Sequence, residues 1–147
     1  MYRIVSKEML TPTICRMKVE ASRLASAALP GQFLIVRADE QGERIPLTIS
    51  DFDKDAGTVT IVTQKIGAST SEICSYEEGD SFSDVVGPLG IPSDFTEMSD
   101  EELDGKRYVF IAGGVGTAPV YPQVKWLHER GASVDVIIGA KTKELVI

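Results

Sequence analysis

The chain has 147 residues, of which 43% are hydrophobic and 25% charged, and its net charge is −7. This length favours one domain or one and a fraction. The acidic balance, with no basic cluster, argues against nucleic acid or an anionic membrane as partner. No apolar run is long enough for a transmembrane helix. The two cysteines, Cys15 and Cys74, are isolated in the sequence. They therefore predict no metal or iron–sulfur site in this chain. We expect both cysteines to be small buried side chains of a protein in the reduced cytoplasm.

The first hundred residues are predicted to form short strands separated by turns. Strands at 8–12-residue spacing are typical of a small antiparallel barrel or sandwich. In the fifth strand, Val59, Ile61 and Thr63 are expected to share one face. The turn Gly87–Gly90 is expected to follow the last strand. The predicted strands are Arg3–Met9, Thr13–Ala21, Gln32–Arg37, Ile45–Phe52, Thr58–Gln64 and Ser81–Val86.

One helix is predicted among these strands, because Ser69 and Glu72 have the spacing of a capping box. The acidic segment Ser93–Gly105 is interpreted as a linker between domains.

Beyond the linker the pattern changes to strand, helix, strand. The apolar run Arg107–Ala112 precedes a glycine turn, and a helix with Pro119 near its first position runs to Arg130. Gly131 is a natural C-terminal stop, and Ser133–Gly139 is the second strand. Residues 141–147 are expected to start another helix. The sequence therefore predicts a barrel domain over 1–96 and, over 97–147, the first part of an α/β domain, so that the chain is expected to be part of a longer subunit.

The glycine turn is the strongest candidate binding motif. It follows an apolar strand and opens a helix, so its backbone N–H groups and the helix dipole favour a pyrophosphate. A Cβ would block close approach of phosphate to this backbone. An ordinary strand-to-helix turn is the alternative explanation. The residues concerned are Gly113, Gly114, Val115, Gly116 and Thr117.

Three further motifs have both functional and structural interpretations. Arg44-Ile45-Pro46-Leu47-Thr48 places a cation and a hydroxyl on a strand that Pro46 restricts to an edge or to a point where the ladder opens. Residues 63–70 end a strand and open a helix with small hydroxyl side chains, as an anion site or an ordinary capped helix would. Gly87-Pro88-Leu89-Gly90 alone indicates only a turn.

The order of these four motifs resembles the ferredoxin–NADP reductase superfamily over the whole chain. Within it, the chain is most similar to two kinds of electron-transfer subunit. One is the ferredoxin–NADP reductase alpha subunit of electron-bifurcating transhydrogenases, also named sulfide dehydrogenase subunit. The other is the electron-transfer subunit of dihydroorotate dehydrogenase. The run Ile137–Leu145 favours the first.

The resemblance implies an antiparallel, Greek-key FAD-binding barrel with one capping helix, followed by the first βαβ unit of a nucleotide-binding domain. Thr48 would lie near the reactive edge of the flavin and is the one candidate catalytic residue. The glycine turn 113–117 would face the nicotinamide nucleotide. The FAD contacts implied by the resemblance are Arg44, Pro46, Leu47, Thr48, Thr63, Gln64, Lys65, Gly67, Ala68, Ser69 and Thr70. Related plant-type reductases carry an aromatic residue where Pro46 or Leu47 stands, so flavin stacking would be provided differently.

The function implied is that of an NAD(P)H-dependent flavin oxidoreductase subunit, passing electrons between NAD(P)H, FAD and an iron–sulfur or ferredoxin partner. The partners implied are a larger flavoprotein/iron–sulfur subunit and ferredoxin, with a homodimer through the incomplete α/β segment as a further assembly. An iron–sulfur cluster is expected only beyond these residues or in the partner, and this stretch alone is expected to be inactive. Lys141 and Lys143 are weak indications of NADP over NAD. The alternative to an enzyme subunit is a non-enzymatic barrel that binds a ligand or a partner.

Overall fold

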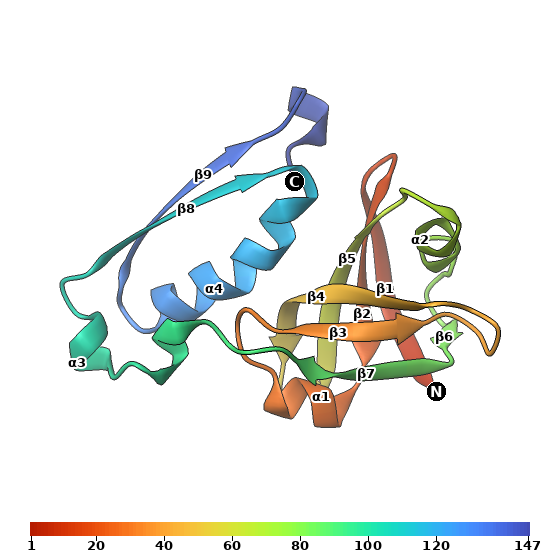
Figure 1. Cartoon of the computed structure of the whole chain (residues 1–147), viewed down its shortest axis with the longest axis horizontal. Coiled ribbons are helices and arrows are strands. Elements are labelled where there is room, and N and C mark those ends of the chain that lie inside the picture. The colour runs from red at the N-terminus through yellow and green to blue at the C-terminus, as the bar shows by residue number, and fades with distance from the viewer.

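The computed structural model describes residues 1–147 as an antiparallel barrel followed by a βαβ unit (Figure 1). Seven strands form one sheet in the order β6-β1-β2-β5-β4-β3-β7, and every neighbouring pair is antiparallel. Because β6 and β7 are consecutive in the chain, the sheet is nearly closed. This confirms the predicted fold class. The strands are β1 (Tyr2–Thr11), β2 (Ile14–Glu20), β3 (Phe33–Arg37), β4 (Arg44–Asp53), β5 (Thr58–Gln64), β6 (Ser81–Phe82) and β7 (Asp84–Leu89).

The barrel has a continuous apolar core of 18 buried residues. Alternation along β2 points Cys15, Met17 and Val19 inward and leaves the charged residues between them exposed. On β5, Val59 and Ile61 are 0% and 1% exposed and Thr63 is 1% exposed, so the predicted shared face is confirmed. One polar side chain, that of Thr63, therefore lies at the end of an otherwise apolar inward row.

Two short helices belong to the barrel. The sequence does not predict α1 (Ser22–Ala27), which buries Leu24 and Ala25 in the barrel core. The second, α2 (Ala68–Ile73), begins after Gly67, so the predicted capping box at Ser69 is wrong. The Thr70 hydroxyl instead accepts from the N–H of Gly67, and the Ser69 hydroxyl bonds to the carboxylate of Glu43. Because glycine has no side chain, Gly67 cannot cap the helix itself, and Thr70, three residues later, provides the capping hydrogen bond.

The motif Gly87–Gly90 is mostly strand, so the expected turn is wrong for its first three residues. The predicted closing strand is also interrupted at Ser83, whose N–H bonds to the carbonyls of Arg37 and Ala38. At Gly87, a Cβ would lie 3.0 Å from Cβ of Leu34 and 3.1 Å from Cδ1 of Leu24. Glycine is required there because the strand passes close to two core side chains.

The acidic segment after the barrel is folded, which corrects its interpretation as a plain linker. It contains η1 (Asp94–Glu97) and α3 (Asp100–Leu103). Ser99 and Glu102 form a reciprocal capping box at the start of α3. Leu103 is fully buried and packs with Leu127 in a second, three-residue core. The charged residues thus form the exposed side of a small covering element.

The βαβ unit consists of β8 (Arg107–Gly113), η2 (Gly114–Gly116), α4 (Thr117–Glu129) and β9 (Ser133–Gly139). β8 and β9 pair in parallel from Arg107↔Ser133 to Gly113↔Gly139. Gly131 has a φ of +79°, and the N–H groups of residues 131 and 132 bond to carbonyls of the last helical turn, so the predicted stop is confirmed. The final segment forms only a short turn, η3 (Lys143–Leu145), in place of the expected helix start.

Helix α4 lies between the two-stranded sheet and the barrel (Figure 1). Two polar contacts join it to the barrel side. The Lys125 amine bonds to the Asp51 carboxylate of β4 at 2.8 Å, and the hydroxyl of Ser93 bonds to the amide oxygen of Gln123 at 3.0 Å. No helix here has the length and apolarity needed to cross a membrane.

Candidate functional site

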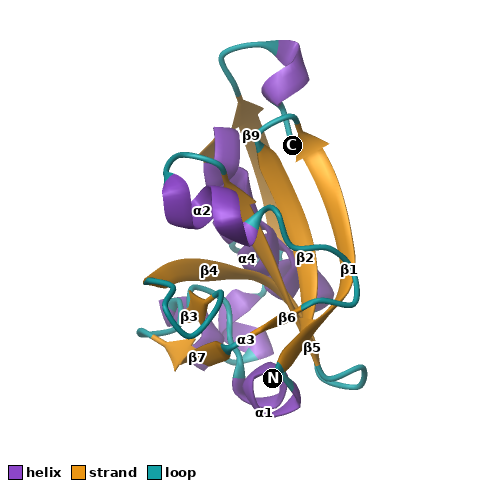
Figure 2. Ribbon diagram, turned by 90° about the vertical axis from the view of Figure 1, so that its right-hand side faces the viewer, coloured by secondary structure: helices purple, strands orange, loops and turns teal.

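The site begins where β4 separates from β5. The first half of β4 pairs only with β3, from Arg37↔Arg44 to Phe33↔Thr48, and its pairing with β5 begins at Ile49↔Ile61. Figure 2 shows β4 running across the direction of β2 and β5. The predicted role of Pro46 is confirmed, because it lies where the ladder is open and needs no N–H for β5.

A cleft of about 330 Å³ occupies this opening, within the size range of small-molecule sites. One wall is the open half of β4, a second is the end of β5 with the start of α2, and the third is η2 with the first turn of α4. Its lining residues are Ile45, Pro46, Leu47, Thr48, Val62, Thr63, Gln64, Ile66, Thr70, Val115, Gly116, Ala118 and Pro119. The lining is mainly apolar with a few converging polar groups, as expected for a site that takes a flat, partly apolar ligand.

Two buried hydroxyls at this junction have no hydrogen-bond partner. They are Oγ1 of Thr63, a residue that lines the cleft but whose hydroxyl is buried behind its wall, and Oγ1 of Thr117 at the start of α4. An unsatisfied buried polar group costs about 1–3 kcal/mol. A bound ligand or an ordered water can supply the missing partner of such a group. The two hydroxyls therefore fit a ligand with polar atoms seated between the barrel and α4.

A second hollow of about 450 Å³ adjoins the cleft and shares Val62 and Ala118 with it. Thr117 and Tyr121 line it from α4, and Arg16 and Lys18 line it from β2. The two hollows together give a continuous surface on both sides of the first turn of α4. One is mainly apolar, and the other carries two cations.

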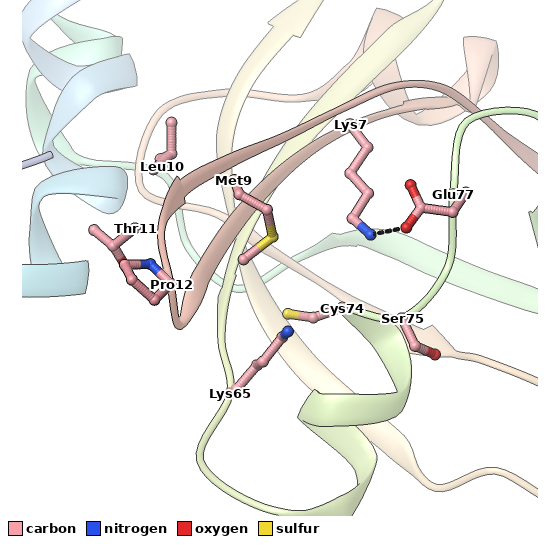
Figure 3. Close-up of a pocket in the computed structure, with 9 residues that line it drawn as sticks. All are labelled: Lys7, Met9, Leu10, Thr11, Pro12, Lys65, Cys74, Ser75 and Glu77. Carbon is pink, nitrogen blue, oxygen red and sulfur yellow. Dashed lines mark hydrogen bonds and ion pairs between the residues drawn. The ribbon is translucent and has the colours of Figure 1, made fainter.

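The structure brings together half of the predicted contact residues. Those that line the cleft are Pro46, Leu47, Thr48, Thr63, Gln64, Thr70, Val115 and Gly116. Thr117 lines the adjoining hollow. Arg44 does not line the cleft, because its guanidinium pairs with Asp84 at 2.9 Å. Lys65 points into a separate hollow beside Cys74 (Figure 3). The backbone-defined residues Gly67, Ala68, Ser69, Gly113 and Gly114 lie on the flanking segments without lining the cleft.

Sequence reasoning missed five lining residues. Ile45 lies inside one candidate motif and Pro119 lies directly after another, so their positions next to predicted contact residues could have indicated them. Val62, Ile66 and Ala118 carry no pattern of their own, because they line the cleft only through the separation of β4 from β5 and the approach of α4.

The cationic side chain of Lys125 on α4 forms an ion pair with the barrel wall of the site. The hydrogen bond from Lys125 to Asp51 raises the pKa of the lysine, and the Coulomb attraction of the same carboxylate adds to that effect against partial burial. Because Asp51 is on β4, just beyond the open half of the strand, this pair fixes the third wall of the cleft relative to the first.

The fold matches the FAD-binding barrel and the start of the nucleotide-binding domain of ferredoxin–NADP reductase-type flavoproteins. Phthalate dioxygenase reductase superposes with a TM-score of 0.76 at 19% identity over 98% of this chain and 44% of its own, a likeness of fold. The NADH-dependent reduced ferredoxin–NADP oxidoreductase, studied for flavin-based electron bifurcation, superposes with a TM-score of 0.88 at 35% identity over all of this chain and 51% of its own.

Sequence relatives agree with this class. The dihydroorotate dehydrogenase B electron-transfer subunit homolog of Thermotoga maritima is 37% identical over 98% of this chain and 49% of its own length. An uncharacterised protein of Clostridium beijerinckii is 56% identical over all of this chain and 50% of its own length. The chain thus spans about half the length of these relatives. No protein-family model matches. The predicted resemblance to the ferredoxin–NADP reductase superfamily is confirmed, with homologues among dihydroorotate dehydrogenase electron-transfer subunits.

Proposed function

We propose that this chain is the FAD-binding part of an electron-transfer flavoprotein subunit that exchanges electrons with NAD(P)H and passes them to an iron–sulfur partner. The observation that carries the proposal is the cleft at the separation of β4 from β5, with the unpartnered Thr63 hydroxyl behind its wall. When bound, a flavin accepts a hydride and releases electrons, and the protein contributes orientation and electrostatics.

The cleft residues would hold the flavin ring in defined ways. Pro46 and Leu47 present apolar surface along the open edge of β4 in place of an aromatic side chain. Thr48 and Thr63 offer hydroxyls from opposite walls to the polar edge of the ring. Each neutral hydrogen bond of this kind contributes about 0.5–1.5 kcal/mol.

The flanking backbone segments would take the phosphates. Helix α2 begins at Ala68 with no side chain bonded to its first N–H groups, so those of residues 68–70 are free to bind a phosphate. Across the cleft, η2 and the start of α4 would approach the nicotinamide nucleotide through residues 113–117. On this proposal residues 1–96 form the FAD-binding domain and 97–147 belong to an NAD(P)-binding domain.

The partner is one of two kinds. Relatives named as dihydroorotate dehydrogenase B electron-transfer subunits support a dihydroorotate-oxidising partner, and the solved NADH-dependent reduced ferredoxin–NADP oxidoreductase supports a larger bifurcating subunit. Affinity purification of the tagged protein from its own cells separates them. Dihydroorotate-dependent reduction of an acceptor dye by the isolated complex supports the first, and NADPH-dependent reduction without dihydroorotate supports the second.

The cofactor is tested directly by titrating the cofactor-free chain with FAD and with FMN, following flavin fluorescence. We expect saturable binding of FAD and clearly weaker binding of FMN, because FMN lacks the second phosphate. Thr63→Val keeps the shape of the side chain and removes the hydroxyl, and it should weaken FAD binding about 2- to 12-fold.

Thr58→Val is the matched control, because Thr58 is buried on the same strand but pairs with Glu20 and Asp53 at the far end from the cleft. It should leave FAD affinity unchanged. A chain that binds no flavin, or binds it equally well in both variants, would refute the proposed site.

A further inference from the structure

The two cysteines form a contact that the sequence does not predict. Cys15 is on β2, Cys74 follows α2, and their sulfurs lie 2.8 Å apart although the residues are 59 positions apart in sequence. Both are free thiols and almost fully buried. Their interpretation as buried small residues is confirmed, but they are not isolated from each other. Only a small movement would join the two sulfurs covalently.

Cys74 also lines an open surface hollow of about 730 Å³ on the outside of the barrel (Figure 3). The amines of Lys65 and Lys7 line the same hollow, and in the figure the Lys65 amine lies beside the Cys74 sulfur. Glu77 is paired with Lys7 at 2.6 Å. A small, uncharged oxidant entering the hollow would therefore reach one of the two sulfurs, that of Cys74.

The surroundings shift the pKa values of the two thiols in opposite directions. The hydrogen bond donated by Cys15, together with the nearby Lys65 and Lys7, lowers the pKa of Cys74 to about 7 against the opposing effect of burial. The hydrogen bond to Cys74 and burial both raise the pKa of Cys15. The thiol form of Cys74 also donates a hydrogen bond to the carbonyl of Thr63 at 3.5 Å, which opposes loss of its proton, and the Glu77 carboxylate is held by Lys7. Of the two sulfurs, the surroundings therefore favour the thiolate at Cys74 and the protonated thiol at Cys15.

We propose that Cys74 and Cys15 form a peroxide-reactive dithiol pair, in which Cys74 attacks a hydroperoxide and Cys15 resolves the product into an intramolecular disulfide. In the first step the Cys74 thiolate forms an S–O bond, the O–O bond of hydrogen peroxide breaks, and hydroxide leaves. In the second, the sulfur of Cys15 attacks that of Cys74, the S–O bond breaks, and the proton of Cys15 leaves with the hydroxide as water. Two thiols and one peroxide give one disulfide and two waters.

The disulfide would connect the C-terminal end of α2 to β2, so its formation would fix the end of α2 relative to the barrel. A thiol reductant would return both sulfurs to the reduced state. The reaction involves no flavin, and its test is independent of the proposed function.

The test treats the folded, reduced chain with hydrogen peroxide and follows free thiols and intact mass. Because the chain has two cysteines, a loss of both thiols with the mass of two hydrogens from a monomer identifies the disulfide. We expect the rate to rise with pH with a midpoint near 7, whereas the urea-unfolded chain should show the ordinary cysteine midpoint of about 8.5.

Single variants separate the two roles. Cys15→Ala should stop at a sulfenic acid on Cys74 that dimedone traps, whereas Cys74→Ala should leave Cys15 unreacted over the same time. Lys7→Gln removes one cation beside the hollow and should move the midpoint to higher pH. Lys54→Gln, on the exposed β4–β5 turn, is the matched control and should leave the midpoint unchanged.

Three results would overturn the proposal. They are retention of both thiols in the folded chain, a disulfide between two molecules, and equal reactivity of Cys15 and Cys74 in the single variants. Because the first two are measured on the unaltered chain, a variant that folds poorly does not prevent a decision.

Discussion

The barrel and the βαβ unit differ sharply in how they bury apolar residues. The barrel has 18 buried residues in one cluster, whereas the cluster beside β8 and β9 has three. On the two parallel strands, Val109, Ile111 and Ile137 are 56%, 77% and 56% exposed. An antiparallel sheet that closes on itself covers its inner face unaided, but a parallel sheet needs cover on both faces. The two parallel strands are thus covered far less completely than the barrel strands and leave several large apolar side chains exposed.

The largest expected effect is a core truncation in the barrel. Ile61→Ala removes a side chain that is 1% exposed on the central strand β5, and it should lower the free energy of unfolding by about 2–5 kcal/mol. Ile111→Ala makes the same chemical change on β8 and should alter the free energy of unfolding by less than about 0.5 kcal/mol. Urea denaturation of both variants measures the two free energies. Equal losses would contradict the contrast between the two regions.

The next effect concerns the site, where stability and binding should change in opposite directions. Thr63→Val removes an unpartnered buried hydroxyl and should raise the stability of the cofactor-free chain by about 1 kcal/mol. The same change should weaken FAD binding. Thermal unfolding with and without FAD measures both effects. A loss of stability without cofactor would show that the hydroxyl has a partner within the protein.

An effect of similar size is expected at the end of α4. Gly131 has a φ of +79° with open space around it, so Gly131→Ala meets no side chain and strains only the backbone. The cost is about 1 kcal/mol. Amide hydrogen exchange should show this loss in α4 and β9 and leave the barrel strands unchanged. Faster exchange throughout the barrel would mean that the two regions unfold as one unit.

The smallest effect is expected for the ion pair that joins the regions. Lys125→Met removes the bond to Asp51, a partly exposed pair that contributes about 0.2–1 kcal/mol. The pKa of Lys125 is raised in the folded chain, so its contribution is complete below the ordinary lysine pKa of about 10.4 and is lost as pH rises through the raised value.

The fluorescence of Trp126, the only tryptophan, reports on α4 during that titration. The unaltered chain should show an alkaline transition that Lys125→Met lacks. Lys54→Gln, on the exposed turn, should keep the transition. An unchanged transition in Lys125→Met would assign it to another group.

Much of the fold could be predicted because periodicity is local. The bounds of β5 and β9 match the sequence prediction, since β5 is a run of mostly β-branched residues that begins after Gly57 and β9 holds the apolar run Val136–Ile138 that ends at Gly139. The short α1 could not be predicted, because Ala21 at its cap makes no side-chain bond and six residues carry little pattern. The motif around Gly87 indicates a turn when it is considered alone. The structure needs glycine there for close contact with Leu24 and Leu34, and that contact depends on segments far apart in sequence.

The candidate site shows the same limit. Motif residues such as Pro46, Thr48 and Thr63 do meet in one cleft, because β4 separates from β5 before Ile49 and leaves its first half facing the end of β5. Arg44 and Lys65 do not line it, since a partner across β3 holds the first and the second points into the separate hollow beside Cys74. Side-chain direction at the end of a strand is set by tertiary contacts, which local patterns do not record.

The central claim is that FAD occupies the cleft between β4, β5 and the start of α4. Ala118 lines both hollows at this junction, so Ala118→Trp should fill the space without entering the barrel core. Fluorescence titration with FAD should show binding to the unaltered chain and loss of binding in Ala118→Trp, at an unchanged urea midpoint. His128→Trp, on the exposed side of α4, should bind FAD normally. FAD binding by Ala118→Trp with unaltered affinity would contradict the account.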